Sequence, residues 1–135
     1  MGECLLTFSL RFYTSHRLSS PFLDERQNRE VYGKCANPRG HGHDYVVSIT
    51  LKGSPAAESG LLMPRRRMLL TARRALSPVL DHRCLNQELG EDFITTGENI
   101  VRLLWDKLKD KFPPCTLQRV RLQETPKNFF AYYGP

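Results

Sequence analysis

The sequence lacks most features that would direct a chain to a membrane or to an oxidising compartment. It contains no run of 18 consecutive apolar residues, so we expect no membrane-spanning helix. Residues 1–10 carry no basic flank and only a broken apolar stretch, so we expect no secretory signal. Only four cysteines are present, none in a C-x-x-C pair, which indicates reduced thiols in a cytoplasmic protein.

Internal repeats and low-complexity tracts are also missing, and the 135 residues suit one domain, residues 1–135, with one buried core. Twenty Lys and Arg oppose fourteen Asp and Glu, giving a net charge of +6. That surplus favours an anionic partner: nucleic acid, an acidic membrane or a phosphorylated small molecule. Basic residues are not interleaved with exposed aromatic residues in any nucleic-acid-binding motif, so we expect no nucleic acid as partner. We expect no membrane partner either, since no apolar run is long enough to span one.

Alternating apolar residues predict three strands, over Leu6–Thr14, Tyr45–Lys52 and Leu117–Thr125. Residues 17–40 are rich in Ser, Pro, Asn, Arg and Gly, and this composition predicts a long loop.

Helical spacing of apolar residues predicts two helices. The first runs from Pro64 to about Leu80, with Ser77-Pro78 kinking or ending it. The second follows a capping box in Thr95-Thr96-Gly97-Glu98 and stops before Pro113-Pro114. The order of elements predicts an α+β fold in which both helices cover one face of an antiparallel sheet.

The chain has four histidines, and three of them continue apolar strand faces. His41 and His43 share the face of Tyr45 and the odd positions that follow it. His16 lies on the even face of the first strand, two steps beyond Phe12. Residues two apart on a strand point the same way, about 7 Å apart, so their nitrogens can converge on one ion. Three imidazoles with an open fourth position form the usual catalytic zinc site; the alternative is surface or hydrogen-bonded core histidines.

Other reactive side chains lie near these histidines in the sequence, each with a simpler alternative. Cys35, six residues before His41, suits a base or nucleophile, or is an inert buried thiol. Asp81 and His82 suit a proton relay, although adjacent Asp-His pairs also arise by chance. Glu124 continues the third strand's apolar face and suits an N–C–N–H group such as a pterin, or is a solvated strand end.

Collinear motifs over nearly the whole chain resemble the 6-pyruvoyltetrahydropterin synthase family. Five residues separate Cys35 from His41, as in the animal enzymes, whereas the bacterial 6-carboxytetrahydropterin relatives typically have three. The motifs are Phe12-x-x-x-His16-Arg17-Leu18, Tyr32-Gly33-Lys34-Cys35, Asn37-Pro38-x-Gly40-His41-Gly42-His43-x-Tyr45, Leu80-Asp81-His82-x-x-Leu85, Glu98-Asn99 and Glu124-Thr125.

The resemblance implies a T-fold, whose sheets join into a barrel in a trimer, with two trimers stacked as a homohexamer. It implies a zinc-dependent carbon–oxygen lyase that converts 7,8-dihydroneopterin triphosphate to 6-pyruvoyltetrahydropterin plus triphosphate, towards tetrahydrobiopterin. Magnesium would accompany the triphosphate. By resemblance the residue roles are zinc ligation by His16, His41 and His43, general base Cys35, proton transfer by Asp81 and His82, pterin anchoring by Glu124, and further pterin contacts at Thr95, Thr96 and Glu98.

The sequence departs from the family pattern at several positions. Arginines crowd the helix over Arg65–Arg74, where the family has mixed charges, so it either binds a polyanion or presents a solvated face. Gly97 replaces a usual Thr, and Ala36 and Arg39 replace usual Asn residues near the thiol; Arg39 would help to hold triphosphate or perturb the loop. These changes keep two alternatives open: a related dihydropterin side-chain lyase, and a non-catalytic zinc- or pterin-binding paralogue.

Overall fold

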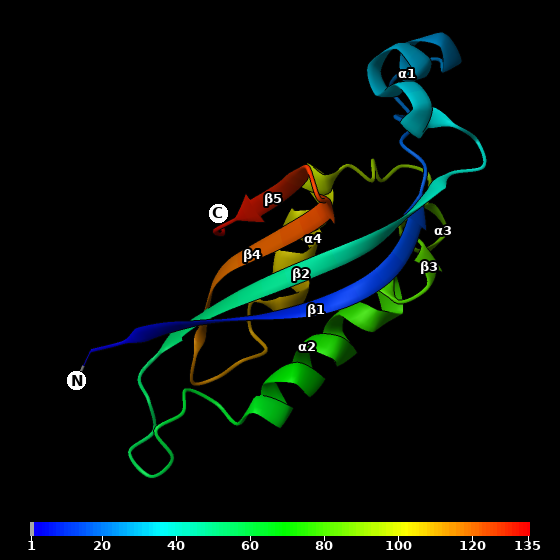
Figure 1. The fold of residues 1–135 in the computed structure, drawn as a ribbon. Helices are drawn as coiled ribbons and strands as arrows, with labels where there is room; N and C mark the ends of the chain where they lie inside the picture. Colours follow the sequence, from blue (N-terminus) through cyan, green and yellow to red (C-terminus); the bar gives the residue numbers. More distant parts are fainter. Residues whose placement is uncertain (1) are drawn as a thin grey trace.

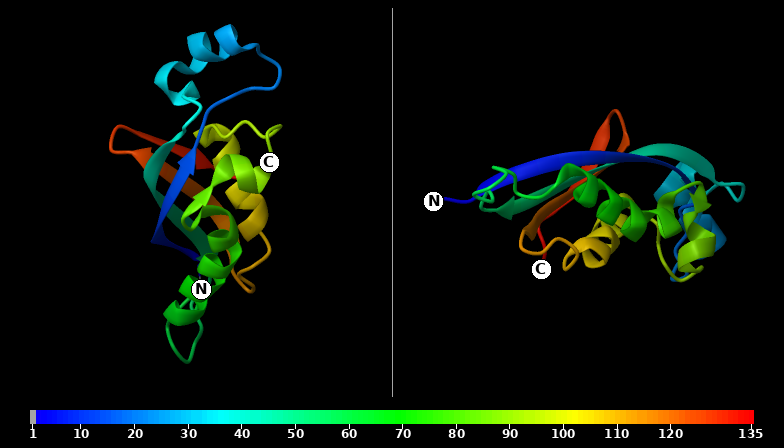
Figure 2. Two further views of the ribbon diagram at one scale, coloured as in Figure 1. Left: turned by 90° about the vertical axis from the view of Figure 1, so that its right-hand side faces the viewer. Right: turned by 90° about the horizontal axis from the view of Figure 1, so that it is seen from below.

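The computed structural model describes residues 2–135 and has two layers, a twisted sheet and helices packed on one side of it (Figures 1 and 2). No helix of the described residues combines the length and the apolar character needed to cross a bilayer. The elements in chain order are β1 (Cys4–His16), α1 (Glu25–Tyr32), the 3-10 helix η1 (Gly33–Ala36), β2 (His41–Gly53), α2 (Arg65–Leu80), β3 (Arg83–Cys84), α3 (Leu85–Leu89), α4 (Gly97–Leu108), β4 (Thr116–Thr125) and β5 (Asn128–Tyr132).

The sheet has five strands in the order β3-β1-β2-β4-β5. β1 and β2 pair antiparallel along their whole length, from Cys4 opposite Gly53 to His16 opposite His41. The prediction of an antiparallel sheet is confirmed for β1, β2, β4 and β5. It is wrong for β3, which runs parallel to β1 through Thr14 and Ser15. β3 was unforeseen because two residues are too few to show a period.

The predicted strand faces form the core. Even positions of β1 and odd positions of β2 face the helices, and Phe12, Tyr45 and Ile49 are almost fully buried. Their partners are the apolar stripes of α2 and α4, including Leu76 and Leu104. Full burial of such side chains stabilises the fold by about 1.5–3 kcal/mol each. The expected placement of two helices on one face of the sheet is therefore confirmed (Figure 2).

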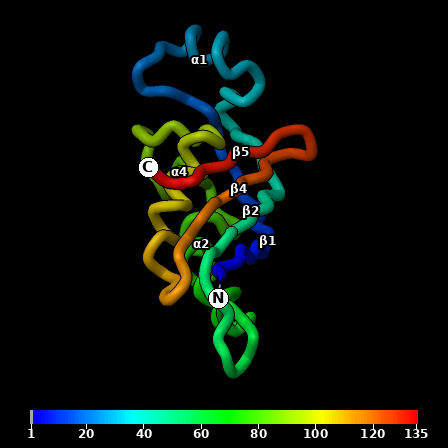
Figure 3. The backbone as a smooth tube through the Cα atoms, turned by 90° about the vertical axis from the view of Figure 1, so that its left-hand side faces the viewer, coloured from blue at the N-terminus to red at the C-terminus, as the bar shows by residue number. Residues whose placement is uncertain are grey.

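The predicted loop over residues 17–40 is wrong, because it contains α1 and η1. This segment projects from one end of the sheet, as the tube in Figure 3 shows. α1 has few apolar residues, so hydrophobic periodicity could not reveal it. A capping box between Asp24 and Gln27 starts the helix, and buried Asn28 donates to the Ser20 carbonyl oxygen.

The helix predicted from Pro64 to about Leu80 is confirmed as α2, which continues through Pro78 and does not end at the proline. Two other features differ from the predictions. α4 is capped by Thr96, whose hydroxyl accepts from the Asn99 amide, so the predicted capping box from residue 95 to 98 is displaced by one position. The last strand, β5, was unforeseen and pairs with β4.

Candidate functional site

The antiparallel register brings three histidines together at one end of the β1–β2 ribbon. His16 lies directly opposite His41, and His43 lies opposite Thr14. All three rings occupy the face that continues the core, as the period-two pattern predicts. Each offers one ring nitrogen within 4.8 Å of those of the other two.

The ring geometry suits a shared ligand. Ring centroids of His41 and His43 lie 4.6 Å apart, those of His16 and His41 4.6 Å, and those of His16 and His43 5.0 Å. The Nε2 atoms of all three are buried and have no hydrogen-bond partner in the described chain. Burying such atoms unpaired is unfavourable, and a cation bound between them would satisfy all three at once.

The surroundings keep these imidazoles neutral, which is the form that binds a metal. The pKa of His16 is lowered to about 4, mainly by burial and then by the neighbouring His41 and His43, while a hydrogen bond to Thr95 opposes the shift. Burial also lowers the pKa values of His41 and His43. The site therefore needs no deprotonation at neutral pH before it can accept a cation.

Thr95 orients the deepest of the three rings. His16 Nδ1 lies 2.9 Å from the Thr95 carbonyl oxygen and donates to it, which directs Nε2 toward the other two histidines. The Thr95 hydroxyl donates to the Arg17 carbonyl oxygen at 3.0 Å, and the residue is fully buried. In metal sites, a hydrogen bond from the ring nitrogen that does not bind the metal fixes the tautomer and the orientation of the histidine. The structure thus places Thr95 behind His16, while the expected pterin contact stays a prediction.

Glu124 stands beside the three histidines on β4. Its Oε1 lies 3.8 Å from His43 Nε2, and its Oε2 accepts a long hydrogen bond of 3.4 Å from the Tyr45 hydroxyl. Burial raises the pKa of Glu124, and the nearby Glu98 raises it too, while the Tyr45 bond opposes this. The half-buried carboxylate is therefore next to the candidate metal site and available to a polar ring.

Tyr45 was missed as a site residue by the sequence analysis. The sequence pattern places it on the apolar face of β2 and at the end of the motif that contains His41 and His43, without giving it a role. Burial and Glu124 together raise the pKa of its hydroxyl, which keeps it a hydrogen-bond donor. The sequence does contain an indication of this role. Tyr45 is the apolar-face residue next to His43, and its ring carries a hydroxyl that can reach a site formed by the histidines.

Cys35 lies in η1, and this turn is fastened to the end of β1. The Leu18 amide donates to the Cys35 carbonyl oxygen at 2.8 Å, and Arg17 Nε donates to the Ala36 carbonyl oxygen at 3.2 Å. The thiol is unpaired and partly exposed. These contacts hold the thiol-bearing turn against the residues that follow His16.

The structure does not bring Asp81 and His82 to the three histidines within one chain. His82 packs beside Tyr13, with ring centroids 6.1 Å apart, and its amide donates to the Tyr13 carbonyl oxygen. Tyr13 occupies the opposite face of β1 from His16. Asp81 and His82 are hydrogen-bonded at 3.0 Å, and His82 has a φ of 56°, an uncommon backbone for a side chain of this size.

The remaining expected contacts lie at the start of α4. Thr96 is the N-cap of this helix, and Glu98 is exposed in its first turn. Glu98 is close enough to Glu124 to disfavour its ionisation. These two acidic groups and the helix N-terminus therefore surround the same edge of the site.

Comparison with known proteins decides the family. The family model described as 6-pyruvoyl tetrahydropterin synthase matches residues 5–135. The chain belongs to the 6-pyruvoyl tetrahydropterin synthase family. It is 35% identical to the 6-pyruvoyl tetrahydrobiopterin synthase of Homo sapiens over 93% of this chain and 88% of that protein. The Drosophila melanogaster synthase is 36% identical over 96% of this chain and 79% of that protein.

A solved structure of the family has the same fold. The Caenorhabditis elegans 6-pyruvoyl tetrahydropterin synthase superimposes with a TM-score of 0.92 at 33% identity, covering 100% of this chain and 98% of that one. The family resemblance inferred from the motifs is therefore confirmed, as is the α+β architecture.

One departure from the family pattern has a clear structural counterpart. Gly97 opens α4 beneath the ring of Phe130 from β5, and a Cβ at position 97 would overlap that ring. The residue that the family usually has, threonine, cannot fit here unless Phe130 moves. Gly97 and Phe130 thus form one packing unit at the edge that carries Glu98 and Glu124.

Proposed function

We propose that this chain is a 6-pyruvoyltetrahydropterin synthase, which converts 7,8-dihydroneopterin triphosphate to 6-pyruvoyl-5,6,7,8-tetrahydropterin and inorganic triphosphate. The observation that carries the proposal is the cluster of three neutral histidines with unpartnered Nε2 atoms beside the carboxylate of Glu124. Membership of the synthase family supplies the reaction class.

The donor set fits zinc, and His16, His41 and His43 would hold it through Nε2. Three imidazoles leave a fourth position for substrate, which is the arrangement of catalytic zinc sites. Bound zinc would act as a Lewis acid on a substrate oxygen and so acidify the neighbouring C–H bond. We further propose that Mg²⁺ accompanies the triphosphate of the substrate, in keeping with the affinity of this ion for phosphate oxygens.

The side chains around the histidines would bind the ring and move protons. Glu124 anchors the pterin through its N–C–N–H edge, and Tyr45 keeps the carboxylate oriented. Thr96 and Glu98 contact the same ring from the start of α4. Cys35 takes a proton from the substrate side chain, and the leaving triphosphate departs with the electrons of the broken carbon–oxygen bond. The rest is an internal rearrangement, so no external oxidant is needed.

We propose that His82 and Asp81 act as the second proton-transfer pair at the site of a neighbouring subunit. Their place on the face of β1 opposite His16 supports this division, since side chains on opposite faces of a strand point away from each other. Open sheet edges support assembly too. β3 covers β1 only at Thr14 and Ser15, and such edges favour pairing with another strand.

The assembly that we propose is a homohexamer of two stacked trimers, in which the open edges close each trimeric sheet into a barrel. Exposed apolar side chains at both edges, Leu5 on β1 and Phe129 on β5, support this arrangement. A cytoplasmic location fits the four unpaired thiols of the described chain.

Shared sites can be tested by mixing two inactive variants. Cys35→Ala and His82→Ala subunits are each expected to be inactive, and co-refolding them would restore part of the activity if the two groups come from different subunits. Mixtures as inactive as the parents, with mixed oligomers shown by native mass spectrometry, would assign both groups to one chain.

The activity itself is tested with zinc-loaded protein, dihydroneopterin triphosphate and Mg²⁺. Triphosphate release together with the 6-pyruvoyl product would support the synthase. Side-chain cleavage without that product would identify a related lyase. A folded, zinc-loaded protein that produces neither would be a non-catalytic relative.

A further inference from the structure

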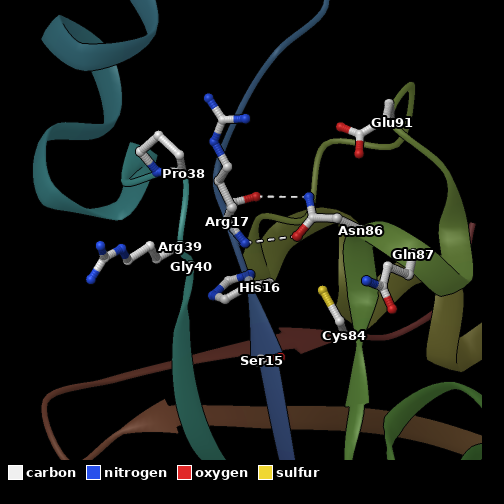
Figure 4. Close-up of a pocket in the computed structure, with 10 residues that line it drawn as sticks. All are labelled: Ser15, His16, Arg17, Pro38, Arg39, Gly40, Cys84, Asn86, Gln87 and Glu91. Carbon is white, nitrogen blue, oxygen red and sulfur yellow. Dashed lines mark hydrogen bonds between the residues drawn. The ribbon is translucent and has the colours of Figure 1, made fainter.

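A polar cavity of about 190 Å³ lies at the end of β1, next to His16 (Figure 4). His16 itself lines it, so the cavity adjoins the candidate metal site. Two arginines line it, Arg17 directly after His16 and Arg39 in the turn before β2; Figure 4 shows their guanidinium groups pointing in different directions, so the Arg39 side chain would turn to reach a ligand shared with Arg17. Asn86 and Gln87 of α3 line the other side.

Hydrogen bonds and close packing fix the backbone segments that line this cavity. Asn86 binds both sides of Arg17, since its Oδ1 accepts from the Arg17 amide at 2.7 Å and its Nδ2 donates to the Arg17 carbonyl oxygen at 2.9 Å. Gly40 has a φ of 71°, and a Cβ there would lie 3.0 Å from the His16 carbonyl oxygen. The turn that carries Arg39 therefore packs closely on the strand that carries Arg17.

Both guanidinium groups have donors to spare. Arg17 uses Nε on the Ala36 carbonyl oxygen, which leaves its terminal nitrogens for a ligand. Within residues 2–135, neither Arg17 nor Arg39 has a carboxylate within 4.0 Å. Forked guanidinium donors match the spacing of phosphate oxygens.

The order of groups along the ribbon matches a pterin with a phosphorylated tail. Glu124 lies level with His43 and Tyr45, His41 and His16 come next, and the two arginines follow. Arg39 lies four positions before His43, at most about 13 Å away along an extended chain. A ring held at Glu124, with its side-chain oxygens at the histidines, would therefore extend its far end toward the arginines.

We infer that Arg17 and Arg39 form the subsite for the triphosphate of the substrate. The inference rests on the proposed function, and it assigns to Arg39 a role that the family pattern, with Asn at this position, does not supply. Glu91, the one carboxylate that lines the cavity, works against the binding of a free polyanion. Removing the Glu91 carboxylate should therefore strengthen the binding of triphosphate, whereas removing either arginine should weaken it.

The test measures binding of inorganic triphosphate to zinc-loaded protein by isothermal titration calorimetry. Arg39→Gln and Arg17→Gln are each expected to weaken binding about fivefold, and Glu91→Gln to tighten it about twofold. Arg74→Gln, which removes an exposed arginine of α2 far along the chain from this cavity, is the matched control and should change nothing. The slope of affinity against salt should fall only in the two cavity-arginine variants.

Steady-state kinetics then ties the cavity to the reaction. Both arginine variants should lower kcat/KM for dihydroneopterin triphosphate by at least the factor lost in triphosphate binding, because the two arginines contact the leaving group on which negative charge develops. An active wild type with triphosphate affinity unaffected by Arg39→Gln and Arg17→Gln would overturn the inference and leave the proposed function intact. An inactive wild type whose triphosphate binding still depends on both arginines would instead count against the synthase alone. Unchanged melting temperature and zinc content exclude misfolding as the cause of a loss.

Discussion

Substituting alanine for Gly97 should destabilise this protein, even though alanine is the better helix former. Gly97 is the first residue of α4 and is buried. An added Cβ would overlap the ring of Phe130, which lies across the start of the helix. The higher helix propensity of alanine would stabilise the protein, and the overlap with Phe130 would destabilise it. The relative sizes of these two effects decide the sign of the change in the free energy of unfolding.

The overlap outweighs the gain in helix propensity. Exchanging glycine for alanine within a helix gains at most about 1 kcal/mol, and less at the first position. Forcing an extra carbon into a packed site costs about 1–3 kcal/mol. Phe130 is only partly buried, so its ring can move aside and the cost falls in the middle of that range. We expect a net loss of about 1–2 kcal/mol, or about 3–8 °C in melting temperature for a chain of this size.

A double-mutant cycle with Phe130→Ala separates this overlap from other effects. Urea unfolding of the wild type, both single variants and the double variant gives the coupling free energy directly. In the Phe130→Ala background, Gly97→Ala should be neutral or slightly stabilising, since the space is free. Equal destabilisation in both backgrounds, or a gain in the wild-type background, would refute the reasoning.

Three further predictions concern the histidines and the thiol. His41→Ala should lose bound zinc and activity together, measured by metal analysis and triphosphate release, and unchanged metal content would contradict the three-histidine site. Cys35→Ala should lower turnover by at least about 100-fold with zinc content and pterin binding retained, measured by kinetics and fluorescence titration. Because the pKa of His16 is about 4 in the fold and about 6.5 in the unfolded chain, the unfolded state takes up the proton first. In metal-free protein the free energy of unfolding should therefore fall by about 3 kcal/mol between pH 6.5 and pH 4, and a pH-independent value over that range would show that His16 is not buried as described.

The candidate metal site could be predicted from the sequence because it depends on a simple period. Leu6 through His16 and His41 through Leu51 each alternate with period two, so the faces that carry the histidines follow from the apolar residues. The only missing information was the pairing of the two strands. Their register, with His16 opposite His41, turns two separate patterns into one cluster.

Features that depend on polar contacts, and not on a period of apolar residues, could not be predicted in this way. α1 begins at a side-chain cap and is anchored by Asn28, which leaves no hydrophobic period to detect. The support of His16 by Thr95 joins residues 79 positions apart through a backbone oxygen. Likewise, the sequence places His82 beside Asp81 but does not show that His82 packs on the face of β1 opposite the candidate metal site.

The three histidines also explain why the fold would carry an otherwise unfavourable feature. Each buried ring nitrogen without a partner costs about 1–3 kcal/mol, so three together approach the whole stability of a small domain. The lowered pKa values show that protonation does not relieve this cost at neutral pH. A divalent cation relieves it by bonding to all three nitrogens, and the binding free energy then adds to the stability of the fold. Two features are therefore unfavourable by themselves: the unpartnered ring nitrogens and the positive φ of His82. The nitrogens lie where a metal ion is proposed to bind, and His82 lies where a neighbouring subunit is proposed to bind.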